Sequence, residues 1–191
     1  GAKQNIGMYQ KDSPYRRIFH DRTDDYYQRL MALENVIITE SFSKSVGLSG
    51  QRLGFIHTTN RELHDELEVR LMYCTNGVNA FAQQLILRLL TTPEGIRAAS
   101  DFKAATARDI ARNIEYLKER GLLAGEFYHA STPKGIFVVV NRTEEELLAH
   151  RIGSVSLSFF TKSRKEEASK YARICVSAPH EKFVTYFDRV K

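Results

Sequence analysis

One lysine lies in a segment whose composition suits a small anionic ligand. Residues 39–54 read TESFSKSVGLSGQRLG, with serines and glycines around Lys44 and with Arg52 eight positions further on. The apolar run 36–38 precedes the segment, so we expect a flexible loop at the end of a buried strand, where phosphate groups are often bound. An amine in its neutral form can act as a nucleophile or a base, and a guanidinium suits phosphate oxygens. An ordinary exposed lysine in a flexible loop remains the alternative.

Strand and helix patterns alternate around this segment. We expect buried strands at 36–39 and 53–58, because both are short apolar runs that flank it. Asn60 is a predicted N-cap for a helix with leucines at 63, 67 and 71, spaced for one helix face. A second helical pattern covers 79–90, and a proline three residues later is expected to break it.

The remainder of the chain has the pattern of a smaller α+β unit. Its longest helical pattern covers 96–120 and ends at a glycine. We expect strands at 127–131, 136–141 and 171–177, with a turn at 132–135 between the first two. Thr143 and Glu146 form a predicted capping box, and Pro179 is expected at the start of a last helix with Phe183, Phe187 and Val190 on its apolar face.

Composition excludes several broad classes of protein. The 191 residues are 42% hydrophobic and 27% charged, which suits one or two globular domains. No apolar run approaches the roughly 18 residues of a membrane helix, and the N-terminus has no signal-peptide pattern, so we expect a cytoplasmic protein with no membrane contact. The net charge of +5 is dispersed among acidic residues, which argues against a nucleic-acid partner.

Cysteines and histidines show no pattern typical of a disulfide framework or a metal site. Cys74 and Cys175 are far apart and form no CxxC pair, so we expect both to be buried thiols. The six histidines form neither an HxH nor an HExxH pattern. No metal ligand is therefore predicted.

The stretch from Ser41 to Gly54 resembles the signature of the class I/II aminotransferases, the aspartate aminotransferase-like pyridoxal-phosphate (PLP) enzymes of fold type I. Ser41 lies three positions before Lys44, Arg52 lies eight after it, and Arg-x-Gly leads into a strand. The resemblance implies that Lys44 forms the Schiff base with PLP and later moves the proton between the substrate α-carbon and the cofactor. It also implies that Ser41 and Arg52 bind the cofactor phosphate.

Three more residues stand in the order that the family has. The resemblance implies that Asp12 pairs with the pyridine nitrogen, that Tyr15 donates to the phenolic oxygen of the ring, and that Arg173 binds the substrate α-carboxylate bidentately. The residues alone leave two alternatives open. Asp12 is also a suitable N-cap ahead of Pro14, and Arg173 could be an edge-strand arginine that reaches to water.

The resemblance implies an α/β fold of the PLP-dependent transferase type I. Residues 1–95 then form the C-terminal part of the PLP-binding large domain, and 96–191 form the small α+β domain. Family members are about twice as long, so we expect this chain to be the C-terminal half of an aminotransferase. A homodimer in the complete protein is implied by the resemblance and by nothing else in the sequence.

The expected activity is transfer of an amino group between an amino acid and a 2-oxo acid, with PLP as cofactor. Two other functions fit the same residues. A PLP-dependent β-lyase that cleaves carbon–sulfur bonds uses the same lysine and aspartate. A non-catalytic effector domain is the second, because aminotransferase-like domains also occur fused to bacterial DNA-binding regulators.

Overall fold

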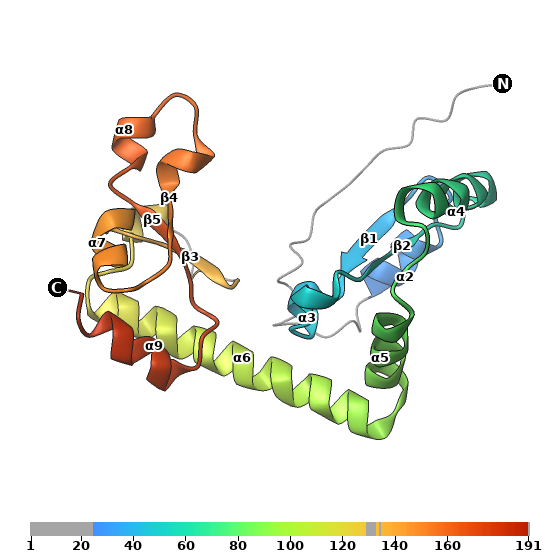
Figure 1. The fold of residues 1–191 in the computed structure, drawn as a ribbon, viewed down its shortest axis with the longest axis horizontal. Helices are drawn as coiled ribbons and strands as arrows, with labels where there is room; N and C mark the ends of the chain where they lie inside the picture. Colours follow the sequence, from blue (N-terminus) through green and yellow to red (C-terminus); the bar gives the residue numbers. More distant parts are fainter. Residues whose placement is uncertain (1–24, 129–132, 134, 191) are drawn as a thin grey trace. The chain divides into compact units, whose positions relative to one another are not determined.

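The computed structural model describes residues 25–128, 133 and 135–190 (Figure 1). The chain divides into two compact units, residues 1–103 and 104–191. The predictions for Asp12 and Tyr15 fall outside the described residues. The expected division at residue 95 into parts of a large and a small aminotransferase domain remains a prediction.

The first unit contains a two-stranded antiparallel sheet with short helices around it. Helix α2 (Asp25–Met31) precedes strand β1 (Ile38–Ser41), which pairs with β2 (Gly54–His57) from Ile38 opposite His57 to Ser41 opposite Gly54. Strand β2 lies within the predicted range 53–58, and β1 begins two residues later than the predicted 36–39. They are only half-buried, and Ile56 is exposed, so the prediction of buried strands was wrong. With a single strand pair, each residue meets apolar neighbours on fewer sides than in a larger sheet.

The segment between β1 and β2 is ordered into two short elements and is not the flexible loop that its composition suggests. Helix α3 (Phe42–Ser45) begins directly after β1, and the 3₁₀ turn η1 (Ser49–Gln51) precedes β2. Leu53 is buried with Ala82 and Ile86, and four half-buried apolar residues pack against these three: Phe42, Val46, Leu48 and Leu89. This small core fixes the segment because both its ends and its middle contribute to it.

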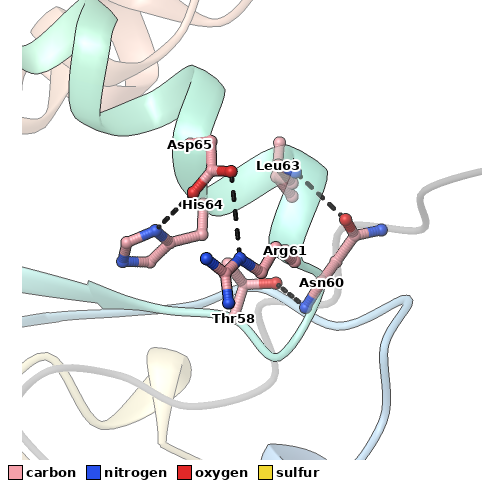
Figure 2. Close-up of polar contacts among 6 residues, drawn as sticks. All are labelled: Thr58, Asn60, Arg61, Leu63, His64 and Asp65. Carbon is pink, nitrogen blue, oxygen red and sulfur yellow. Dashed lines mark hydrogen bonds and ion pairs between the residues drawn. The ribbon is translucent and has the colours of Figure 1, made fainter.

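The N-cap predicted at Asn60 is confirmed. Helix α4 (Arg61–Thr75) starts after Asn60, whose side-chain oxygen accepts a hydrogen bond from the Leu63 amide at 3.0 Å (Figure 2). Helix α5 (Ala80–Thr91) starts after Asn79 in the same way. Such caps satisfy backbone donors that a helix leaves without internal partners.

Helix α6 (Pro93–Glu119) begins three residues earlier than the periodicity predicts. Pro93 ends the preceding helical pattern and is also the first residue of α6, a position where its missing amide hydrogen and fixed φ cost nothing. The Thr92 hydroxyl accepts from the Gly95 amide at 3.1 Å and caps the new helix. The proline therefore separates two helices that are joined by a single residue.

The second unit is built around an antiparallel sheet with strand order β3-β5-β4. The strands are β3 (Phe137–Val140), β4 (Val155–Ser156) and β5 (Ala172–Cys175), and α6 and α9 (His180–Phe187) lie side by side against one face (Figure 1). Alternate strand residues enter the core, among them Val138, Ile174 and Ala172. The predicted strands at 136–141 and 171–177 are confirmed, each in a shorter form.

Shorter elements complete the second unit. The capping box is confirmed at helix α7 (Glu144–Ala149), where Thr143 and Glu146 exchange side-chain and backbone hydrogen bonds. Pro179 directly precedes α9, as expected. The 3₁₀ turn η3 (Leu157–Phe160) and helix α8 (Lys165–Ala168) were not predicted.

Two predictions about individual residues were wrong. Phe127 ends a 3₁₀ turn, η2 (Gly125–Phe127), because its amide donates to the Ala124 carbonyl; the rest of the strand expected at 127–131 lies outside the described residues, apart from Tyr128, which is not in a strand. Cys74 and Cys175 are exposed, not buried. Cys74 lies on α4, which buries no residue, and Cys175 lies on the face of β5 that points away from the core.

One fully buried polar side chain joins three elements of the second unit. The Asn113 amide on α6 donates to the carbonyls of Val176 and Ala178 at 2.9 and 2.8 Å, and its oxygen lies 2.8 Å from His180 Nδ1. Because all its hydrogen-bonding groups are used, the amide fixes the turn from β5 into α9 against α6.

We expect Asn113→Ala to lower the free energy of unfolding by about 2 to 4 kcal/mol, because two carbonyls in a buried setting lose their donor. Urea unfolding monitored by circular dichroism measures this. Arg112→Ala, an exposed change on the same helix, is the control and should shift stability by less than about 0.5 kcal/mol. Equal effects from the two variants would contradict the assigned role of Asn113.

Candidate active site

The candidate lysine lies in the segment that connects the paired strands β1 and β2. Ser41 stands opposite Gly54, and the Phe42 amide donates to the Leu53 carbonyl at 3.2 Å, which extends the pairing by one step. Residues 41–54, which we call the lysine segment, therefore leave and rejoin the sheet at one place. Because the segment begins and ends at this strand pair, Ser41 and Arg52 both lie within two residues of the paired positions. Lys44 on α3 lies between them in sequence.

The local hydrogen bonds of Ser41 explain why a helix forms at Lys44. The Ser41 hydroxyl accepts from the Ser43 amide at 3.1 Å and caps α3, while the buried Ser45 hydroxyl lies 3.4 Å from the Ser41 carbonyl. Within the part of the chain that the structure describes, no residue accepts the Ser41 hydroxyl proton. That proton is thus available to an anionic ligand.

The two cations of the lysine segment have no acidic partner among the described residues. Lys44 is half-buried and makes no ion pair or hydrogen bond with any of them. Arg52 is exposed, and its one side-chain bond in this region goes to the Ser49 carbonyl at 3.2 Å. Two positive charges on one short segment without a carboxylate partner attract an anion. Arg52 also has a left-handed backbone with φ 53°, a strained state found often at binding sites.

Two glycines permit the shape of the segment. A Cβ on Gly54 would lie 2.4 Å from the Glu40 carbonyl oxygen, so only glycine allows β1 and β2 to pair this closely. Gly47 has φ +69°, and a Cβ there would lie 2.6 Å from Cζ of Phe102. The ring of Phe102 therefore packs directly on the backbone of the lysine segment, and Gly47 is needed for both reasons.

Gly54→Ala is expected to destabilise the fold by about 1 to 3 kcal/mol, because the new methyl group meets backbone that cannot move without breaking the strand pair. Gly50→Ala is a matched control in the same segment, since nothing lies within 4 Å of its added Cβ. Urea denaturation of both variants gives the comparison. A Gly54 variant as stable as the Gly50 variant would rule out the close strand approach.

Arg173 lies on the central strand of the second unit's sheet, so the edge-strand alternative was wrong. Its guanidinium carbon lies 4.4 Å from the ring centre of Phe137 and 4.6 Å from that of Phe160. Its Nε is buried and has no hydrogen-bond partner, and none of the described carboxylates forms an ion pair with this side chain. A buried donor without a protein acceptor can bind an oxygen atom of a ligand.

The surroundings of Arg173 are largely uncharged. Val139 and Val155 flank it in the strand register. The Tyr128 hydroxyl accepts from the Val139 amide at 2.7 Å, and burial raises the pKa of Tyr128, so this phenol remains neutral at ordinary pH. Arg173 is thus a cation with mostly apolar neighbours, and in such surroundings it would bind a carboxylate more strongly than in water.

The structure brings together some of the predicted site residues. Lys44, Ser41 and Arg52 lie on one segment of the first unit, and Arg173 lies in the second unit. Sequence reasoning missed the two rings around Arg173. The period-2 pattern of its strand places Phe137 on the face of Val139, the partner of Arg173, but no sequence signal pointed to Phe160.

Neither a metal site nor a membrane span is found in the described ranges. No cluster of three or more histidine, cysteine, aspartate or glutamate side chains in those ranges could hold a metal ion. None of the helices described is both long and apolar enough to cross a bilayer. Two features remain to be explained, the lysine segment of the first unit and Arg173 of the second.

Comparison with known proteins identifies the family. The family described as aminotransferase class I and II matches residues 6–187. The chain belongs to the class I and II aminotransferases. An aspartate aminotransferase of Pyrococcus horikoshii is 27% identical over 92 residues, which are 48% of this chain and 23% of that protein.

Solved aminotransferases share the α/β fold of the chain. An aromatic aminotransferase from Pyrococcus horikoshii matches 82% of this chain and 42% of its own with a TM-score of 0.63 and 22% identity. An aminotransferase from Mycobacterium tuberculosis matches 88% and 43%, with a TM-score of 0.67 and 19% identity. An aspartate aminotransferase from Thermus thermophilus, solved with maleate, matches 83% and 42%, with a TM-score of 0.60 and 20% identity. The chain thus spans less than half the length of the aminotransferases it matches.

The residues present fit the PLP of this family. The cofactor carries a phosphate dianion, and the lysine segment offers two cations that no described carboxylate neutralises, as well as a free hydroxyl proton. The buried, unpartnered Nε of Arg173 separately suits the carboxylate of a substrate. Each unit thus contains a cationic side chain that can bind an anionic group of the cofactor or the substrate.

Proposed function

We propose that this chain carries the cofactor lysine, the phosphate ligands and the substrate arginine of a PLP-dependent aminotransferase. The observation that carries the proposal comes from the lysine segment, which connects the paired strands β1 and β2. Lys44 and Arg52 of this segment have no acidic partner among the described residues. The reaction moves an amino group from an amino acid to a 2-oxo acid.

Lys44 has two tasks in this proposal. Its amine would hold the cofactor covalently in the absence of substrate, and once freed by substrate it would carry a proton to and from the substrate α-carbon. When bound, PLP supplies the electron sink that makes this α-proton removable. Packing of α3 on its small core holds the lysine in place for both tasks.

The remaining residues bind and orient. Ser41 and Arg52 would hold the phosphate, the serine as a donor and the arginine as a cation. Asp12 and Tyr15, which lie outside the described residues, are proposed from the family resemblance alone as partners of the ring nitrogen and the phenolic oxygen. Arg173 would bind the substrate carboxylate through two parallel hydrogen bonds.

The proposal includes a requirement for further polypeptide. The chain spans 42 to 43% of the solved relatives named above, and the described part of its first unit buries few apolar residues. We propose that the remaining part of the fold, and in the complete protein a second subunit, supply the rest of the pocket. The homodimer and the cytoplasmic location stay predictions.

We expect the 191-residue chain alone to show no transamination, because the proposal assigns part of the pocket to further polypeptide. The assay follows glutamate formation from 2-oxoglutarate with each common amino acid as donor. The complete protein that contains these residues should turn over at least one donor. Turnover by the chain alone would contradict the requirement for further polypeptide. Release of pyruvate and a thiol by the complete protein would replace the aminotransferase assignment with a β-lyase.

A further inference from the structure

The guanidinium of Arg173 is held by aromatic rings instead of acidic side chains. Phe137 lies on β3, and Phe160 closes the 3₁₀ turn that follows β4, so the rings come from the elements on either side of β5. Arginine side chains on strands are commonly held by a carboxylate, which fixes the guanidinium and neutralises it together. Here the two rings hold the Arg173 guanidinium in place, and no described carboxylate neutralises its charge.

This arrangement suits a site that must bind a carboxylate repeatedly. A resident acidic partner would compete with the ligand for the same donors. Aromatic faces attract the cation through their quadrupole, leave its N–H edges free and exclude water from its faces. The buried Nε without an acceptor agrees with a guanidinium that is positioned before its ligand arrives.

We propose that Phe137 and Phe160 are positioning residues that orient the Arg173 guanidinium for the substrate carboxylate. This inference rests on the proposed role of Arg173 in substrate binding. Neither phenylalanine needs to touch the substrate or the cofactor in order to act. The two rings restrict the conformations of the Arg173 side chain and thereby raise its affinity for a carboxylate.

Phe160 is the better position for a test because it is 50% exposed, so its removal leaves the core of the second unit intact. Phe159 is a matched control. It is the next residue, is 80% exposed and packs edge to face on Phe160 with ring centres 5.5 Å apart, but no contact between its ring and Arg173 is found in the structure. Phe160→Tyr retains an aromatic face and should behave as the unmodified chain.

The experiment uses the full 191-residue chain labelled with ¹⁵N, with maleate as the probe. Two readouts of the Arg173 Nε–H signal are taken: its heteronuclear NOE, which reports side-chain order, and its shift on titration, which reports carboxylate binding. We expect Phe160→Leu to lower the NOE and to weaken maleate binding about five- to tenfold. Phe159→Leu and Phe160→Tyr should leave both within about twofold.

The outcomes separate the inference from the proposed function. If the Arg173 signal is ordered and Phe160→Leu leaves its NOE and the maleate affinity unchanged, the positioning role is wrong although Arg173 still binds carboxylate. If maleate does not shift the Arg173 signal in the unmodified chain, the proposed substrate role of Arg173 is wrong, and the NOE comparison still decides whether the rings order the side chain. Equal losses in the Phe159 and Phe160 variants would also overturn the inference, because only one of these rings lies over the guanidinium.

Discussion

Replacing Lys44 by alanine is expected to abolish transamination by the complete protein, with a loss of at least about 10⁴-fold in kcat, because one amine serves as both the covalent anchor and the proton carrier. The variant should also lose the visible absorbance band that appears on incubation with PLP. Steady-state turnover and absorbance spectroscopy of the two proteins measure these effects. No neighbouring side chain in the described part of the lysine segment offers a replacement amine.

Lys103→Ala is the control for this prediction. Lys103 is the other lysine among the described residues of the first unit and is half-buried, as Lys44 is. It should retain turnover and the absorbance band within about twofold, because substitutions away from a site have small effects. Residual activity of more than a few per cent in Lys44→Ala would show that this lysine does not carry the proton.

The second large effect is expected at Arg173. Arg173→Lys retains the charge but loses the planar fork, so we expect kcat/KM of the complete protein to fall about 10- to 100-fold, mainly through KM. An ammonium group makes one strong bond where the guanidinium makes two parallel bonds to a carboxylate. Kinetic assays over a range of donor concentrations separate KM from kcat.

Arg164→Lys provides the comparison for Arg173. Arg164 is exposed, lies in the same unit and is already paired with Glu167 through two side-chain hydrogen bonds. Its replacement should leave kcat/KM almost unchanged, because an exposed ion pair contributes little. An Arg173→Lys variant with unchanged KM would show that another group binds the carboxylate.

Features that depend on contacts within a few residues could be predicted from the sequence. The caps predicted at Asn60 and Thr143 are of this kind, because a side chain bonds to a backbone amide three residues later. The spacing of Ser41, Lys44 and Arg52 is also local, and its resemblance to the family signature is the basis on which the lysine segment is proposed as a ligand site.

Features that depend on tertiary packing were predicted poorly. Helix α3 is four residues long, which is too short for a periodic pattern, although Ser41 as its N-cap was a usable signal. The exposure of Cys74 and Cys175 depends on which face of each element meets a core, and the small core of the first unit leaves α4 without a buried residue. Thiols are often buried as a class, but that average does not fix a single position.

The environment of Arg173 shows the same limit at the candidate site. The residue itself was predicted from its place in the chain, whereas Phe137 and Phe160 approach it through strand order β3-β5-β4. Sequence separation of 36 and 13 residues hides such contacts unless the strand register is known. The two rings add to the expected carboxylate-binding arginine a positioned and partly desolvated setting.

The most direct test of the central claim is covalent trapping of the cofactor on the chain. The purified protein is incubated with PLP, reduced with borohydride, digested and mapped by mass spectrometry. We expect one dominant label, on the peptide that contains Lys44, and a lower yield when free phosphate competes for Arg52 and Ser41. Label spread over other lysines such as Lys103 and Lys118, with Lys44 unmodified, would contradict the assignment of the lysine segment as the cofactor site.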